Sequence, residues 1–104
     1  GLVLDADRRV VVTDHGRSGL TPLEFGVLQA LTDEPGRVWP FAELTRTVWG
    51  TSEVGDWAPV HAVVRRLRAK LEQVRAPAEV VAVRGVGFRL DAAAPQASPG
   101  AAAG

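Results

Sequence analysis

Residues 58–74, APVHAVVRRLRAKLEQV, decide the fold of this 104-residue chain. Five aliphatic residues in this stretch are spaced by four, three, four and three positions: Val60, Val64, Leu67, Leu71 and Val74. This spacing predicts a helix with one buried seam. At about 100° per residue, the side away from the seam carries Ala62, Arg65, Arg66 and Ala69, with His61 and Arg68 at the flank of the seam. We therefore expect an apolar face on the core and a cationic face in solvent.

Two further helices are predicted upstream. Thr21-Pro22-Leu23-Glu24 combines a capping box with proline at the first helical position, so a helix begins there. Its buried stripe is Phe25, Leu28 and Leu31, and it ends at the Pro35-Gly36 pair. A second, shorter helix is predicted over 41–48, between Trp39-Pro40 and Trp49-Gly50.

Short segments at both ends of the chain predict strands. Residues 2–4, 8–13 and 17–20 are separated by links too short for crossover helices, which favours an antiparallel meander. Residues 80–83 and 88–90 flank a glycine-containing turn and predict a β-hairpin. The predicted fold class is α+β: a winged helix-turn-helix with an N-terminal antiparallel β-sheet, three helices and a C-terminal β-hairpin wing.

Charge is segregated along the chain although the formal net charge is zero. Residues 1–57 carry five basic and nine acidic side chains, a net charge of −4, whereas residues 58–90 carry seven basic and two acidic ones, a net charge of +5. A basic module inside a neutral chain is typical of a nucleic-acid-binding surface. We expect Arg65, Arg66 and Arg68 to contact the major groove of double-stranded DNA, and Arg84 on the hairpin to reach the adjacent minor groove.

The sequence gives little support for an enzyme, a cofactor or a metal site. There is no cysteine, which excludes disulfides and thiolate ligands. His15 and His61 lie in different predicted elements, with no carboxylate cluster at metal-ligand spacing. Gly85 and Gly87 are followed by neither a third glycine nor a helix, so they predict a turn and not a phosphate cradle. We therefore expect a binding domain and no catalysis.

The ends of the chain predict its domain organisation. There is no methionine, and the first residues enter a strand at once, so we expect the C-terminal domain of a longer protein. Residues 1–91 are predicted as the winged-helix domain. Residues 92–104 are small and turn-rich with no apolar periodicity, and are predicted as a disordered tail. No apolar run approaches the ~20 residues of a membrane span, so we expect a cytoplasmic location without a membrane partner.

Five blocks of the chain resemble the OmpR/PhoB-type effector domain of bacterial response regulators. They stand in the family's order and spacing: 20–25 (LTPLEF), 35–38 (PGRV), 48–50 (VWG), 65–71 (RRLRAKL) and 83–90 (VRGVGFRL). The resemblance implies a four-stranded N-terminal sheet, a preceding phosphorylatable receiver domain in a two-component system, and binding to direct-repeat promoter DNA as a head-to-tail dimer. It also implies a contact with RNA polymerase through the loop at 50–57.

The resemblance carries over to individual residues only in part. Arg65, Arg66 and Arg68 match basic recognition-helix positions, Arg84 matches the wing arginine, and Trp49 and Thr51 match positions near the DNA backbone; His61 and Ala62 on the same helix complete the candidate set. The family's usual polar residues are replaced at several positions: Pro40-Phe41, Ala58, His61, Val63 and Ala82. Each lost phosphate contact lowers the salt dependence of binding.

Two functions remain open on the sequence. The first is a sequence-specific DNA-binding domain of a bacterial transcription regulator. The second is a winged helix that has lost DNA recognition and serves as a protein-interaction module fused to a receiver or an enzyme. The departures at Phe41, Ala58, His61 and Val63 favour the second function, as does the zero net charge. Trp57, in a polar loop, is either an exposed partner-facing ring or a packed lid.

Overall fold

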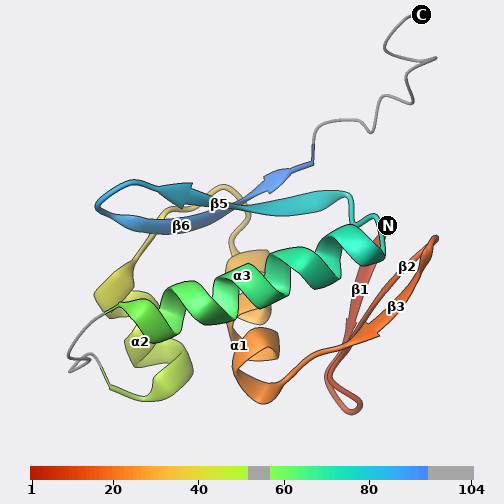
Figure 1. The fold of residues 1–104 in the computed structure, drawn as a ribbon, viewed down its shortest axis with the longest axis horizontal. Helices are drawn as coiled ribbons and strands as arrows, with labels where there is room; N and C mark the ends of the chain where they lie inside the picture. The colour runs from red at the N-terminus through yellow and green to blue at the C-terminus, as the bar shows by residue number, and fades with distance from the viewer. Residues whose placement is uncertain (52–56, 94–104) are drawn as a thin grey trace, which may run out of the picture.

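The N-terminal part of the chain is a three-stranded antiparallel sheet (Figure 1). The computed structural model describes residues 1–51 and 57–93. Its first strands, β1 (Leu2–Asp5), β2 (Val10–Thr13) and β3 (Gly16–Gly19), pair in that order. The predicted antiparallel meander is confirmed. The four strands implied by the family resemblance are not found, because this sheet has three strands within the described residues.

The second strand begins two residues later than predicted. Arg8 and Arg9 belong to the turn after β1, where the Arg8 amide donates to Asp5 Oδ1 at 3.1 Å and Arg9 has a φ of 53°. The Leu20 amide, just after β3, donates to the Arg9 carbonyl at 2.8 Å and so continues the pairing of β2 with β3. A local bond from an aspartate side chain to the backbone competes with strand pairing, which explains the later start.

The three helices lie where the sequence predicts them. Helix α1 (Pro22–Asp33) starts at the capping box, in which Thr21 Oγ1 accepts from the Glu24 amide at 3.2 Å and Glu24 Oε1 accepts from the Thr21 amide at 2.9 Å. Helix α2 (Phe41–Trp49) ends at Gly50 with a left-handed φ of 82°. Helix α3 (Ala58–Gln73) is the longest helix among the described residues and runs across the front of the domain in Figure 1. None of the helices in the described part is long and apolar enough to cross a membrane.

The C-terminal hairpin is part of a second sheet. Strands β5 (Ala78–Val83) and β6 (Gly87–Ala92) form the predicted hairpin. A short strand, β4 (Trp39–Pro40), pairs with the other side of β6, so the order is β4-β6-β5. The sequence did not predict β4, because two residues are too few to show a strand period.

The hairpin also extends into the predicted tail. Ala92 is the last residue of β6, and the Ala93 amide donates to the Pro77 carbonyl at 2.9 Å. Strand β6 therefore ends one residue past the boundary predicted at 91, and Ala93 is still bonded to the residue before β5. The rest of the predicted tail, residues 94–104, lies outside the described residues.

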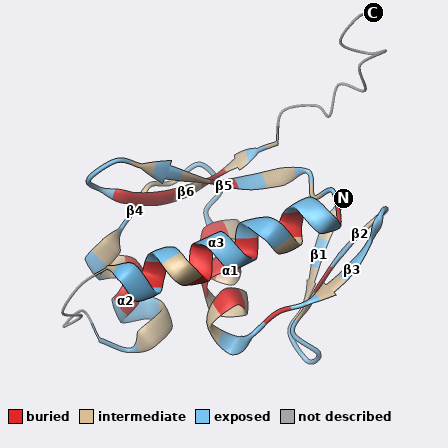
Figure 2. Cartoon of the chain, viewed as in Figure 1, coloured by how far each residue is buried: buried red, intermediate tan, exposed pale blue. Residues whose placement is uncertain are grey.

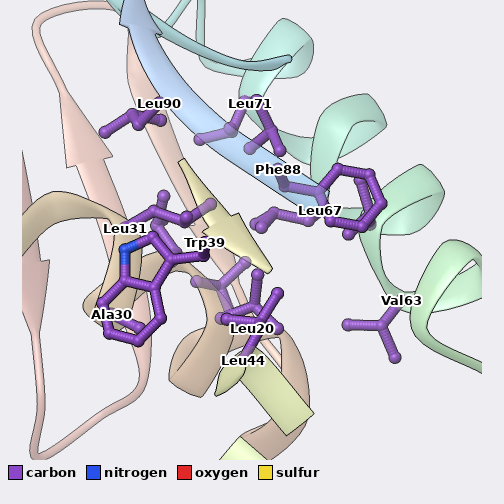
Figure 3. Packing of buried hydrophobic residues seen from close by; sticks show 14 of the residues in the cluster. Leu20, Ala30, Leu31, Trp39, Leu44, Val63, Leu67, Leu71, Phe88 and Leu90 are labelled. Carbon is purple, nitrogen blue, oxygen red and sulfur yellow. The ribbon is translucent and has the colours of Figure 1, made fainter. Parts of the chain in front are cut away.

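The core lies between α3, α1 and the second sheet. The predicted seam of α3 is buried at Val60, Val64, Leu67 and Leu71, and its buried side faces the rest of the domain in Figure 2. Side chains from all three helices and from β4 and β6 meet in this core, which Figure 3 shows from close by. Val63 is only 2% exposed, so the seam is one residue wider than predicted.

Strands β4 and β6 approach each other more closely at Gly87 than any side chain would allow. A Cβ atom added there would lie 1.7 Å from the Trp39 carbonyl oxygen, which belongs to the backbone and has no rotamer to change. Glycine at this position therefore fixes the hairpin against the segment that joins α1 to α2.

We predict that Gly87→Ala lowers the free energy of unfolding by about 1–3 kcal/mol or more, because the methyl group forces the two backbones apart. Gly19→Ala is the matched control, since nothing lies within 4 Å of a Cβ at that position. Urea unfolding followed by circular dichroism measures both variants. Equal midpoints for wild type and Gly87→Ala would contradict the close approach.

Candidate nucleic-acid interface

The outward side of α3 is a cationic face. We use this name for the residues that the sequence placed opposite the seam or at its flank. Of these, His61, Arg65, Arg66, Arg68 and Ala69 are exposed, and Ala62 is half-buried. By helix geometry Arg65 lies at the centre of the face, with small Ala62 and Ala69 beside it. Within the described residues the Arg65 guanidinium makes no ion pair or hydrogen bond, so its donors are available to a partner.

Arg66 is attached to α1 by a buried carboxylate. Glu24 is fully buried, and its Oε2 lies 3.3 Å from Arg66 Nε, while its Oε1 accepts from Lys70 Nζ. The Arg66 side chain is nevertheless 56% exposed. Sequence reasoning assigned Glu24 to the capping box only. Its partners Arg66 and Lys70 lie 42 and 46 positions further along the chain, so no periodic pattern in the sequence indicates the pairing.

The carboxyl group of Glu24 is held ionised by these partners. Burial alone would raise its pKa. The hydrogen bond from Lys70, the backbone hydrogen bond from Thr21, the charge of Lys70 and the hydrogen bond from Arg66 together outweigh burial and place the pKa of Glu24 below its usual value. The charged form is therefore the one that joins α1 to α3.

Arg68 is attached to the hairpin. Its Nε donates to the Val80 carbonyl on β5 at 2.9 Å. Arg65, Arg66 and Arg68 are all exposed, as the sequence predicts, but their attachments within the domain differ. Arg66 and Arg68 are each bound through Nε to a different neighbouring element. Each guanidinium has five donors, so four remain for other contacts.

The hairpin turn places a further arginine in solvent. Arg84 is exposed at the start of the turn, which is closed by a 2.9 Å bond from the Val86 amide to the Val83 carbonyl. The Val86 carbonyl accepts from the Phe41 amide at 3.0 Å, which ties the turn to the first residue of α2. No side-chain partner of Arg84 exists within the described ranges.

The two residues predicted to lie near the DNA backbone are the last residue of α2, Trp49, and Thr51 shortly after it. Trp49 is half-buried and packs against the core, whereas Thr51 is exposed. Most of the loop predicted to touch RNA polymerase, residues 52–56, lies outside the described residues.

Three of the departures from the family pattern line one groove. Phe41, His61 and Ala82 come from α2, α3 and β5, and together with Trp57 and Arg84 they line a hollow of about 430 Å³ between α3 and the hairpin. The sequence shows these departures singly and does not show that they meet.

Aromatic rings pack against one another in this groove. The rings of Phe41 and Trp57 are stacked, with centroids 5.1 Å apart, so of the two placements left open for Trp57 the structure has the packed one. His61 is exposed, and its ring lies 5.5 Å from Phe41 and 5.4 Å from Phe88. Val63 lies in the core, so it supplies no surface to the interaction-module hypothesis.

Other arginines are neutralised within the domain. Arg37 pairs with Glu34 at 2.8 Å and with Glu43, and its guanidinium lies 3.9 Å from the centre of the Trp39 ring. Arg89 pairs with Asp91 at 2.9 Å. The described residues contain no group of three or more histidine, cysteine or acidic side chains that could hold a metal ion.

These elements define the class of protein. An N-terminal antiparallel sheet, three helices and a C-terminal hairpin form a winged helix-turn-helix domain, whose third helix presents the cationic face. A family model described as "Transcriptional regulatory protein, C terminal" matches residues 15–90. The chain belongs to this family of OmpR/PhoB-type domains, which confirms the resemblance noted in the sequence.

Relatives and solved structures agree with this assignment. The transcriptional regulatory protein AfsQ1 of Streptomyces coelicolor is 41% identical over 91 residues, which are 86% of this chain and 40% of AfsQ1. The sensory transduction protein RegX3 of Mycolicibacterium smegmatis is 37% identical over 89 residues, 85% of this chain and 39% of RegX3. The chain thus spans about two-fifths of the length of these relatives.

Among solved structures, the DNA-binding domain of Bacillus subtilis CssR has a TM-score of 0.74 at 27% identity, covering 86% of this chain and 99% of CssR's. The DNA-binding domain of the response regulator AdeR, solved in complex with an intercistronic region, has a TM-score of 0.74 at 28% identity, covering 88% of this chain and 95% of AdeR's.

We predict that the ion pairs of Glu24 stabilise the domain in a pH-dependent way. Because the folded pKa lies below the unfolded value, this stabilisation is fully present above the unfolded pKa and is lost as pH falls through the folded pKa. At pH 7, Glu24→Gln should lower the free energy of unfolding by about 1–3 kcal/mol. The difference between wild type and variant, from urea unfolding at a series of pH values, should shrink below about pH 5. A difference that stays constant down to pH 3 would show that ionisation of Glu24 contributes nothing.

Proposed function

We propose that this domain binds double-stranded promoter DNA in a sequence-specific way, with α3 in the major groove and the β5–β6 turn at the adjacent minor groove. The observation that carries the proposal is the cationic face, in which Arg65, Arg66 and Arg68 are exposed on a helix whose opposite side is buried. A helix of this kind fits the major groove of B-DNA, where arginine donates to guanine or to phosphate. AdeR, a structural neighbour, was solved bound to DNA.

The residues of the interface take distinct roles in this proposal. Arg66, steadied by Glu24, donates to a base edge, while Arg65 and Arg68 contact bases or phosphates. Ala62 allows the helix to approach the bases closely, and His61 lies at the edge of the contact. Arg84 reaches into the minor groove, whose negative potential is greatest where the groove is narrow. The remaining two members of the predicted set, Trp49 and Thr51, lie beside the DNA backbone.

The role of the whole protein follows from the same proposal. AfsQ1 and RegX3 are much longer than this chain. We propose that the domain is the output half of a response regulator, acts on promoters in the bacterial cytoplasm, and lines up head to tail on repeated sites. A contact of the segment at 50–57 with RNA polymerase belongs to the same proposal.

Titration of the chain with a random-sequence duplex at several salt concentrations tests the proposal. Micromolar affinity at low salt is expected, and it should fall as salt rises. If all four arginines of the interface meet phosphates, the slope of log affinity against log salt is about −3.6, and fewer phosphate contacts give a shallower slope. The protein-interaction module predicts weak binding with little salt dependence, and that result would overturn the proposal.

We predict that Arg66→Ala weakens binding to a duplex selected from a random pool by about 1–3 kcal/mol, because a bidentate contact to guanine is lost. Arg17→Ala is the control, since Arg17 is also exposed but lies on β3 of the N-terminal sheet. Fluorescence anisotropy at fixed salt measures both variants. Unchanged affinity of Arg66→Ala for the selected duplex would remove Arg66 from the interface.

A further inference from the structure

One hydrogen bond joins the two parts of the domain that the proposed function assigns to different grooves. The Nε of Arg68 on the cationic face of α3 donates to the Val80 carbonyl of β5 at 2.9 Å. The bond is partly buried, although the Arg68 residue as a whole is exposed. Since β5 ends at Val83 and Arg84 follows at once, a side chain of the helix is bonded to the strand that leads to the wing arginine.

The position of β5 explains why its backbone is open to this contact. It is an edge strand, because the order in the sheet is β4-β6-β5 and β5 pairs with β6 alone. Alternate carbonyl groups of an edge strand point away from the sheet and need another partner. Arg68 meets this need at Val80. Its neighbours Glu72 and Glu79 border the same groove between α3 and β5, but the bond that the structure shows goes to the backbone.

Arginine is suited to this position by its geometry. Its Nε can donate to the carbonyl while the two Nη groups remain available to an anion. Lysine carries the same charge on one compact ammonium group, which lacks the planar fork. A charge-conserving exchange therefore separates the bond to β5 from the electrostatic attraction to DNA.

We propose that Arg68 is a positioning residue, which sets the angle of the hairpin to α3 and thereby places Arg84 in the minor groove. This inference rests on the proposed DNA binding and goes beyond it, because it makes the minor-groove preference of Arg84 depend on a residue of α3. Arg68 acts through Arg84 in this role, whatever phosphate contact it makes in addition. The two arginines should then be energetically coupled, whereas Arg65, which has no bond to the hairpin, should not be coupled to Arg84.

The test uses a binding site that the wild-type chain selects from a random pool of duplexes. This site is placed in two duplexes that differ only in the flank facing the wing, which is an A-tract in one and G·C pairs in the other. For wild type, the A-tract duplex should bind at least about 5-fold more tightly. Arg84→Ala should reduce the ratio of the two affinities, A-tract over G·C, to about one. Arg68→Lys should reduce the same ratio to about two or less. In the double variant, Arg68→Lys should change the ratio no further.

Arg65→Lys is the matched control, an identical exchange one turn away on the same face. It should weaken binding to both duplexes alike and keep their ratio, as expected for a contact that does not act through the wing. Hydrogen exchange reports the structural effect directly. Amides of β5 and of the turn should exchange faster in Arg68→Lys, while those of α1 stay unchanged.

The outcomes distinguish the two proposals. If the wild-type chain binds none of the selected duplexes, DNA binding itself is contradicted. If wild type binds them but Arg68→Lys keeps the full A-tract preference, or if wild type has no such preference, the positioning role of Arg68 is overturned while DNA binding stands. Equal hydrogen exchange in β5 of the wild type and of Arg68→Lys would also overturn it.

Discussion

A fully buried carboxylate, that of Glu24, joins the first helix to the third. A charge removed from water is costly unless partners replace its hydration, so Glu24 requires Arg66 and Lys70 at these positions on α3. The capping box uses the same carboxylate to satisfy the Thr21 amide, and the start of α1 is fixed by the group that fixes α3. The rotation of α3 about its own axis follows from this contact, together with the aliphatic seam beneath it. The direction of the cationic face is thus set inside the domain.

The hairpin is attached to the rest of the domain on both sides of β6. Strand β6 lies in the middle of its sheet, with β5 on one side and β4 on the other. The Gly36 amide donates to the Leu90 carbonyl at 2.9 Å, and the Phe41 amide donates to the Val86 carbonyl at 3.0 Å. These bonds and the close backbone contact at Gly87 attach the hairpin to the segment between α1 and α2. The wing is therefore part of the folded body and not a free arm.

Much of this architecture could be predicted because patterns among neighbouring residues indicate it. The aliphatic period of α3, the capping box at Thr21 and the glycine turn after Val83 are each formed by residues that are close to one another in the sequence. The structure has all three elements. Contacts between distant segments have no such signal. Strand β4 is recognisable only once β6 lies beside it, and the bonds from Arg66 to Glu24 and from Arg68 to Val80 depend on tertiary placement. Exposure of the arginines could be predicted, but their different attachments could not.

Phe41, His61 and Ala82 are far apart in the sequence but line the same groove. A polar residue placed at 41 alone would lose the stacking of Phe41 on Trp57 and stand beside Phe88. The effect of a substitution at 41 therefore depends on the rings of Trp57, His61 and Phe88 beside it. In the evolution of this chain, divergence from the family pattern would proceed most easily as a coordinated set of replacements, and restoring the family's residues one at a time would pass through poorly packed intermediates.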